Sequence, residues 1–396
     1  MSAMNVVLFD DQWRANLLPL AYTRPVADIR VGIITIREKW EALLGKSTSS
    51  STESYLSAKF PLEVASENLF INGSVFPTAN LVQSIQNLEP GKALVHGDVL
   101  VAGVLDADSA NSFDPAKDDW SDTETYSGNL SKLSALWDIF SMNGEQIQAD
   151  FDMITAGKTS QKASSTNNII GNNLFIENGA IVEYATINTE RGAVYIGKDA
   201  EIMEGSLIRG PFALCEGAQV KMGTKVYGPT TVGPGSRIGG EVTNCVIQAY
   251  SNKGHDGFLG HSVIGEWCNL GADTNNSNLK NNYGEVKMWN YAQRDYQPTG
   301  LQFCGLVMGD HSKAGINTMF NTGTVVGVNA NVFGSGFPNK FIPSFSWGGA
   351  QGFSTFDVEK AKEVAVKMYE RRGLEFDKND QDILNNIFEM TKEFRT

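Results

Sequence analysis

The 396-residue chain has few cysteines, few histidines, a deficit of basic charge and no long apolar run. Its four cysteines, Cys215, Cys245, Cys268 and Cys304, form no C-x-x-C pair, so neither a zinc site nor a disulfide framework is expected. The net charge of -13 argues against broad binding to nucleic acid or to an anionic membrane, because both need a basic surface. No apolar run reaches the roughly 18 residues of a membrane span, and the N-terminal MSAMNVVLFDD lacks the basic flank of a signal peptide. We therefore expect a cytoplasmic protein in which any bound phosphate meets a local basic pocket.

A six-residue repeat of aliphatic side chains runs through the second half of the chain. A period of six fits neither a helix nor a simple hairpin, but it fits a solenoid whose triangular coil has three six-residue faces. Of the 40 glycines, 29 lie between residues 170 and 350, where tight corners need them. The pattern predicts a parallel β-helix. Its unbroken part consists of Ile196, Ile202, Ile208, Leu214, Val220, Val226, Val232 and Ile238, and the register recurs at Ile170, Ile176, Val182, Ile264, Leu270, Met308, Ala314, Phe320, Val326 and Val332.

Two polar segments, 240–262 and 278–304, interrupt the repeat. A solenoid can be a scaffold or a spacer without chemistry of its own. Loops held on a rigid scaffold are, however, where catalytic residues usually lie. We therefore expect the functional site in these interruptions. The first contains two of the four histidines, His255 and His261.

Residues 253–278, KGHDGFLGHSVIGEWCNLGADTNNSN, carry a specific resemblance. They resemble the active-site segment of the acetyltransferase domain in the bifunctional bacterial enzyme that makes UDP-N-acetylglucosamine. More broadly, residues 167–340 resemble the left-handed hexapeptide-repeat acyltransferases, which implies a left-handed β-helix, acetyl-CoA as acyl donor and a homotrimer. The positions that match without a gap are Gly254, His255, Phe258, Leu259, Gly260, Gly265, Asn269 and Asn278.

The resemblance assigns catalytic roles that the chemistry explains. An amine attacks a thioester only when neutral, so a base of near-neutral pKa is needed, and His255 is the candidate. Asn278 or a backbone N–H would donate to the oxyanion, and Asn269 would position the sugar. The alternative for His255 is a loop histidine that hydrogen-bonds backbone. His261 is expected to be structural, and His311 is a weaker second candidate for the base.

The chain departs from that family at its phosphate contacts. Phe258 stands where the family has a tyrosine, Thr243 stands where it has a lysine, and an arginine is missing from PFALCEGAQV. Arg209 and Lys253, with Lys221 and Arg237, could replace these contacts, and surface solvation is the alternative for each. The acceptor is thus open between an amino sugar phosphate and an amino sugar nucleotide.

The N-terminal segment resembles the opening of sugar-phosphate nucleotidyltransferases. NVVLFDD reads as a buried strand, and in LLPLAYTRPVAD the family's Pro19, Leu20, Thr23, Arg24 and Pro25 are present. The glycine-rich turn that lets backbone approach a triphosphate is replaced by residues 10–14, DDQWR.

Three further residues bear on what this domain does. Arg14 and Arg24 could bind a sugar nucleotide without turning it over. Asp98, in LVHGDVLVAG, resembles the family's Mg²⁺ ligand, and a turn aspartate is an equal interpretation. We expect a reduced binding or structural domain more than an active nucleotidyltransferase.

These observations predict three parts. Residues 1–155 form an α/β nucleotidyltransferase-like domain, residues 167–350 the β-helix and residues 351–396 a helical tail that begins after Ser354 or Asp357 and is interrupted at Gly373. Residues 47–54, STSSSTES, read as a flexible surface loop.

The function predicted from the sequence is acetyl-CoA-dependent N-acylation of an amino sugar phosphate or nucleotide. One alternative is a bifunctional enzyme that also forms a sugar nucleotide with Mg²⁺. The other is a non-catalytic scaffold that binds a sugar nucleotide.

Overall fold

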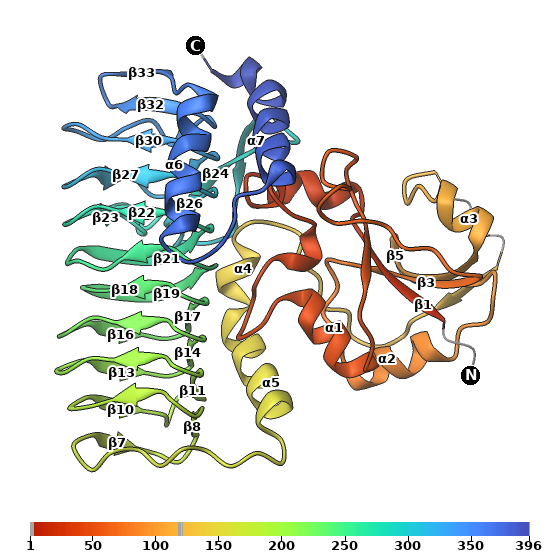
Figure 1. Cartoon of the computed structure of the whole chain (residues 1–396), viewed down its shortest axis with the longest axis horizontal. Coiled ribbons are helices and arrows are strands. Elements are labelled where there is room, and N and C mark those ends of the chain that lie inside the picture. The colour runs from red at the N-terminus through yellow and green to blue at the C-terminus, as the bar shows by residue number, and fades with distance from the viewer. Residues whose placement is uncertain (1–3, 118–119, 121, 396) are drawn as a thin grey trace. The chain divides into compact units, whose positions relative to one another are not determined.

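The computed structural model describes residues 4–117, 120 and 122–395, and the chain divides into two compact units. The first unit holds the residues up to Leu17, Ala21–Ile29 and Ile34–Ala135, and the second holds Leu18–Leu20, Arg30–Ile33 and the chain from Leu136 onward. The predicted fold class is confirmed: an α/β domain, a parallel β-helix and a helical tail (Figure 1). By their internal contacts the units divide near residue 135, because the helices between residues 138 and 155 pack on the solenoid.

The first unit is a mixed six-stranded sheet in the order β2-β1-β3-β5-β4-β6. Its apolar core includes Val7 and Phe9 of β1 and Phe70 of β3. The strands are β1 (Asn5–Phe9), β2 (Ser49–Ser51), β3 (Glu67–Asn72), β4 (Ala93–His96), β5 (Val99–Asp106) and β6 (Thr123–Thr125). The helices are α1 (Ile36–Leu44), α2 (Ala79–Gln86), α3 (Ala107–Ser112) and the short η1 (Gln12–Leu17), η2 (Leu20–Tyr22) and η3 (Val26–Asp28).

The serine-rich segment 47–54 is not the flexible loop that its composition predicts. Ser49–Ser51 form β2, which pairs in parallel with β1, and Ser50 is buried. Arg37, which is half-buried, donates to the Ser50 hydroxyl at 2.6 Å and to the Asp28 carboxylate at 2.7 Å, so it supplies the polar partner that Ser50 needs. Composition alone misjudged this segment because serine is small enough to pack at a sheet edge once its hydroxyl is satisfied.

The solenoid stacks its coils so that the strands of one coil pair in parallel with those of the next, except that the last strand of face three forms an antiparallel hairpin with the strand before it (Figure 1). Face one contains β7 (Asn168–Ile170), β10 (Thr186–Asn188), β13 (Leu207–Arg209), β16 (Lys225–Tyr227), the first halves of β19 (Glu241–Ile247) and β21 (Phe258–Ile264), then β23 (Asn275–Asn276) and β28 (Met319–Phe320). Face two contains β8 (Leu174–Ile176), β11 (Val194–Ile196), β14 (Phe212–Leu214), β17 (Thr230–Val232), the second halves of β19 and β21, β26 (Leu306–Met308), β29 (Thr324–Val326) and β31 (Phe341–Ile342). Face three contains β9 (Ile181–Val182), β12 (Glu201–Ile202), β15 (Gln219–Val220), β18 (Arg237–Ile238), β20 (Asn252–Lys253), β22 (Asn269–Leu270), β27 (Lys313–Ala314), β30 (Asn331–Val332), β32 (Ser346–Gly349) and β33 (Gly352–Thr355).

The repeat predicts the interior of the solenoid well. The eight aliphatics from Ile196 to Ile238 belong to one buried core, as do the later positions from Ile264 to Val332. Ile170 was predicted wrongly, because its neighbour Ile169 packs on the core.

Of the two expected interruptions, one is real. In the segment 240–262 the coil continues with closer spacing, and its interior positions include Val242, Ile247 and Leu259. Residues 278–304 do leave the coil and form a hairpin of β24 (Lys287–Asn290) and β25 (Asp295–Pro298).

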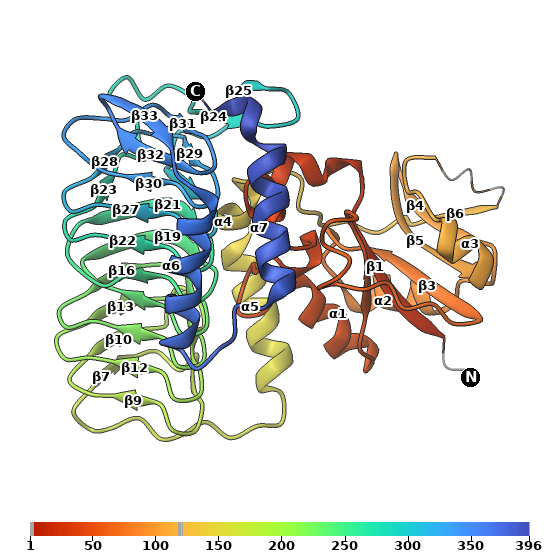
Figure 2. The same ribbon diagram turned by 45° about the horizontal axis from the view of Figure 1, so that its top comes forward.

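Four helices and a terminal turn accompany the solenoid: α4 (Asp138–Ser141), α5 (Asn143–Thr155), α6 (Val358–Glu370), α7 (Lys378–Met390) and η4 (Lys392–Phe394). Figure 2 shows α6 running along the stack of coils. Asp357 caps α6 as predicted, because its side chain accepts from the Lys360 N–H. In the part of the chain that the structure describes, no helix is long and apolar enough to cross a bilayer.

Candidate functional site

His255 lies in the turn between β20 and β21, at the corner where face three meets face one. Of the four histidines, all of which the structure describes, it alone has an exposed side chain. The backbone of the preceding coil packs closely against this turn. A β-carbon at Gly239 would lie 2.6 Å from the Gly254 carbonyl oxygen and 3.1 Å from the His255 nitrogen. His255 is thus an accessible imidazole on a constrained backbone.

Lys253 holds this turn from inside the solenoid. It takes the interior position one coil above Ile238, and only 3% of its surface is exposed. Its ammonium group donates to the carbonyl oxygens of His255 at 2.6 Å and Asp256 at 3.2 Å. Burial lowers the pKa of Lys253 to about 8. The Lys253 side chain therefore faces inward and positions the His255 backbone.

Phe258, Asn278 and His261 gather around Gly260 on face one. A β-carbon at Gly260 would lie 2.5 Å from the Phe258 ring and 2.6 Å from the Asn278 amide nitrogen, so a larger residue there would displace one of these side chains. The Asn278 amide nitrogen lies 2.9 Å from Nδ1 of His261. Because an amide nitrogen only donates, Nδ1 accepts and the ring proton of His261 lies on Nε2.

His261 is a constrained and neutral histidine. Its φ of 48° puts it in the left-handed region at the corner between faces one and two. The ring stacks on Phe303 at 5.2 Å and meets the edge of Phe140 at 6.0 Å. Burial lowers its pKa to about 4. At neutral pH His261 can donate from Nε2, but it is too weak a base to take a proton from an ammonium group.

Asn269 lies on a different face from Asn278. It belongs to β22 on face three, where its amide oxygen accepts from the Asn252 amide at 2.9 Å. The gap-free motif therefore places His255 at a corner, with Asn269 on one side of it and Phe258 and Asn278 on the other. A single chain does not bring all of these side chains together around one cavity of those described.

His311, the weaker candidate for the base, is buried in an aromatic stack. It is 6% exposed and parallel to Trp267 at 6.4 Å and to Tyr369 of α6 at 6.2 Å. A histidine enclosed in this way serves the docking of α6 and offers no route for a substrate. The sequence does not predict the burial of His311, because the stacking partners lie about 44 and 58 residues away along the chain.

Arg209 lies on face one, on the same face as Phe258. Its guanidinium group is 6.0 Å from the centre of the Tyr227 ring, and both line a groove of about 240 Å³ together with Lys225. The sequence prediction missed Lys225 and Tyr227. The repeat could have indicated both residues, because outward positions of successive coils are neighbours in the ladder, and Arg209 pairs with Tyr227.

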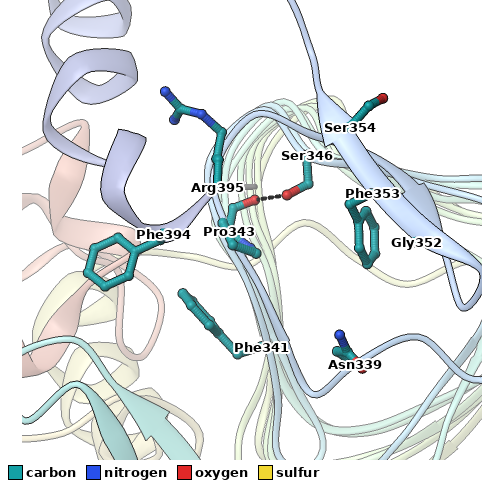
Figure 3. Close-up of a pocket in the computed structure, with 9 residues that line it drawn as sticks. All are labelled: Asn339, Phe341, Pro343, Ser346, Gly352, Phe353, Ser354, Phe394 and Arg395. Atoms are coloured by element: carbon teal, nitrogen blue, oxygen red, sulfur yellow. Dashed lines mark hydrogen bonds between the residues drawn. The ribbon is translucent and has the colours of Figure 1, made fainter.

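A second cavity, of about 440 Å³, lies at the last coils of the solenoid (Figure 3). Phe341, Phe353 and Phe394 line it, and Figure 3 shows the Arg395 side chain directed away from Phe341. Arg395 donates to the Phe388 carbonyl at 2.6 Å and to the Thr391 hydroxyl at 2.8 Å. The guanidinium group therefore fixes the end of the chain and leaves an apolar cavity.

In the first unit, the end of β1 forms a groove of about 660 Å³ that carboxylates line. Asp10, Asp11 and Arg14 are among the lining residues. Asp10 lies 3.1 Å from Nε of Arg14, and Asp11 lies 3.2 Å from Nζ of Lys132. Each cation that could meet a phosphate here is thus already paired with a carboxylate. Arg24, the other predicted ligand contact, is 7% exposed, so it is not free to meet a ligand from solvent.

Asp98 occupies the tight turn between β4 and β5, which agrees with the alternative reading of a turn aspartate. It shares a small cavity with Asp11 and Asn72. The Asp11 carboxylate pairs with Lys132 and accepts a hydrogen bond from the Asn72 amide at 2.9 Å. Among the described residues, no group of three metal-ligating side chains occurs. Because the Asp11 carboxylate is already engaged in this way, the donor set beside Asp98 does not fit Mg²⁺.

Comparison with known proteins agrees with this two-part organisation. Residues 6–159 match the family model of sugar nucleotidyl transferases. A bifunctional sugar-1-phosphate nucleotidylyltransferase/acetyltransferase of Sulfurisphaera tokodaii is 31% identical over 38% of this chain and 38% of its own length. The bifunctional protein GlmU of Synechococcus elongatus is 26% identical over 50% of this chain and 37% of its own length. An uncharacterized acetyltransferase of Escherichia coli, YaiX, is 25% identical over 39% of this chain and 68% of its own length.

Among solved structures, the polysialic acid O-acetyltransferase OatWY resembles 48% of this chain and 88% of its own chain, with 10% identity and a TM-score of 0.28. The chain spans well under half the length of the bifunctional proteins that it matches. The family match and the relatives in sequence show that the chain is similar to transferases of the GlmU kind, with a sugar nucleotidyltransferase-like domain before a β-solenoid.

Proposed function

We propose that the solenoid transfers an acetyl group from acetyl-CoA to the amine of an amino sugar phosphate or amino sugar nucleotide, with His255 as general base. The observation that carries this proposal is the accessible imidazole of His255 on a turn fixed by Lys253. Acetyl-CoA as donor follows from the resemblance of residues 253–278 and from acetyltransferase relatives.

Each step of this reaction has a candidate group. His255 takes a proton from the acceptor ammonium, which leaves a lone pair to attack the thioester carbonyl. The negative charge that develops on the carbonyl oxygen needs a donor, for which the second N–H of the Asn278 amide or Nε2–H of His261 is suited. Collapse of the tetrahedral intermediate expels CoA as the thiolate, which takes the proton from His255. The freed imidazole then accepts the second proton from the amide nitrogen and releases it to solvent.

The separation of Asn269 from Asn278 supports an active site that a second copy completes. These two side chains lie on different faces, so one chain leaves an acceptor at His255 open on one side. The trimer implied by the resemblance therefore remains part of the proposal, and cytoplasmic location remains an expectation from the sequence.

The test is release of the CoA thiol with a panel of amino sugar phosphates and nucleotides. We expect His255→Ala to lower kcat by about 10²- to 10⁴-fold, the usual contribution of a general base. Asp256→Ala is the matched control, because it removes an exposed side chain from the same turn and leaves the carbonyl that Lys253 binds. Undiminished turnover in folded His255→Ala would contradict the assignment, and so would an equal loss in Asp256→Ala.

For the first unit, we propose a reduced domain that binds a ligand or serves structure, without nucleotidyl transfer. The paired charges Asp10–Arg14 and Asp11–Lys132 support this, because a triphosphate would have to displace a carboxylate from each cation. We expect no pyrophosphate release from nucleoside triphosphates and sugar-1-phosphates in the presence of Mg²⁺. Sustained release that depends on Arg14 would establish the bifunctional alternative.

A further inference from the structure

The groove on face one has the chemistry of an anion site. Arg209 and Lys225 face it from neighbouring strands, and none of its nine lining residues is acidic. Neither cation makes a hydrogen bond or an ion pair with any described residue, although the chain as a whole carries a charge of -13. Glu241, the residue next to Lys225 on the ladder, lies on the adjoining strand and forms no ion pair with it among the described contacts.

The rest of the lining suits the organic part of a phosphate ester. Tyr227 and Leu207 are 42% and 52% exposed, so a ring face and an apolar surface lie open to a ligand beside the two cations. The Tyr227 ring lies against the Arg209 guanidinium group and limits its freedom. Thr186 and Asn188 add polar groups on the strand below. The groove thus offers two positive charges, a ring face and hydrogen-bonding groups in one place.

The groove lies on the same face of the solenoid as the cluster of Phe258, His261 and Asn278 around Gly260. Along face one, Lys225 is followed by Glu241 and then Phe258, and Tyr227 by Thr243 and then Gly260. Strands lie about 4.8 Å apart, so the cluster is about 10 Å from Lys225 and about 14 Å from Arg209. Between the strand backbones, that span is longer than one sugar ring, which favours a ligand that carries phosphate further from its reacting group than a sugar monophosphate does.

We propose that Arg209, Lys225 and Tyr227 form a subsite for the diphosphate of a nucleotide whose reacting group lies at the Phe258–Gly260 cluster. This inference rests on the proposed function and makes it more specific. Two reactants carry such a diphosphate at a suitable distance, namely CoA and an amino sugar nucleotide. An amino sugar-1-phosphate does not use the groove, so the acceptor is a nucleotide if CoA binds elsewhere.

The test is calorimetric titration of the full chain with CoA, UDP, dTDP and glucosamine-1-phosphate. In Arg209→Ala and Lys225→Ala we expect the Kd of CoA or of a nucleoside diphosphate to rise at least about tenfold, the usual effect of losing a charge-assisted contact. The matched control is Lys198→Ala, an exposed lysine of the same solenoid whose nearest carboxylate oxygens are 3.9 Å and 4.0 Å away. Its Kd values should stay within twofold.

Each outcome decides the proposal. Weaker binding of CoA alone assigns the groove to the donor, and weaker binding of UDP or dTDP alone assigns it to the acceptor. Unchanged affinities in both folded variants overturn the subsite, as does a wild-type chain that binds none of the diphosphates. Binding does not require turnover, so failure here is separate from failure of His255 as the base, which the thiol-release assay measures.

Discussion

At the scale of single residues, the two histidines of one segment have opposite environments. His255 is exposed on a turn that Lys253 fixes, whereas His261 is enclosed by Phe140 and Phe303 and bonded to Asn278. The sequence predicts the importance of the segment but cannot assign these roles, because the partners of His261 come from α4 and from the loop after β23. Burial and hydrogen bonding, which differ between residues six positions apart, decide which imidazole can take a proton.

His261 gives a prediction on how stability depends on pH. Its pKa is about 4 in the folded chain and near 6.5 when unfolded, so the unfolded state binds more protons between these values. His261 therefore makes its full contribution to the free energy of unfolding above about pH 6.5. This contribution falls as the pH is lowered toward 4. Because the ring is partly solvated, we expect this loss to be roughly 1–2 kcal/mol.

Urea denaturation at pH 7.0 and pH 4.5 measures this loss. His261→Phe should lose less stability than the wild type over the interval. If His261→Phe loses as much free energy of unfolding between pH 7.0 and pH 4.5 as the wild type does, groups other than His261 cause the loss.

At the scale of elements, α6 is fixed to the solenoid by a column of aromatic rings. Tyr369 stacks on Trp267 at 4.0 Å, and Trp267 in turn stacks on Tyr250 at 4.4 Å. Tyr250, Trp267 and His311 all have φ near 53–62°, at corners where lower coils have Gly217 and Gly235. A left-handed conformation costs a bulky residue about 1–2 kcal/mol, so the stack offsets a local strain.

The stack predicts the effects of substituting Tyr369. Tyr369→Ala should lower the free energy of unfolding by about 2–4 kcal/mol, because it removes a ring that stacks on Trp267 and packs beside His311. Tyr369→Phe keeps the ring and should cost less than about 1 kcal/mol. Limited proteolysis between α6 and the solenoid would show whether the helix loosens. Equal stabilities of the two variants would contradict the stacking argument.

The elements also show what the sequence can and cannot predict. The six-residue spacing predicted the interior from Ile196 to Ile238, and Asp357 marked the start of α6. The spacing failed at residues 240–262, because the coil there accepts Lys253 as an interior residue when two carbonyl groups satisfy its charge. The groove around Arg209 was only partly predictable, since it depends on alignment between strands of different coils.

At the scale of the whole molecule, the second compact unit includes a piece of the N-terminal chain. Arg30–Ile33 belong to the solenoid unit, where Gln248 accepts from the Arg30 N–H at 2.8 Å and donates to the Arg30 carbonyl at 3.1 Å. Thr231 donates to the Gly32 carbonyl at 2.9 Å, and Asp150 accepts from the Ile33 N–H at 2.7 Å. Gln248 and Asp150 are almost fully buried, so these bonds have no replacement from water.

This arrangement predicts that the solenoid is not independent of the first 33 residues. A chain that begins at residue 136 leaves buried polar groups on Gln248, Asp150 and Thr231 without Arg30–Ile33, at about 1–3 kcal/mol each. It should therefore unfold at a lower urea concentration than the solenoid of the full chain. In the full chain, Gln248→Leu should lower stability by roughly 2–4 kcal/mol, because the Arg30 N–H and carbonyl lose their partners. Gln219→Leu, on the exposed side of face three, should cost less than about 1 kcal/mol. Equal urea midpoints for the truncated and full-length solenoids would show instead that residues 30–33 do not stabilise the solenoid. The two units could then be studied as separate proteins.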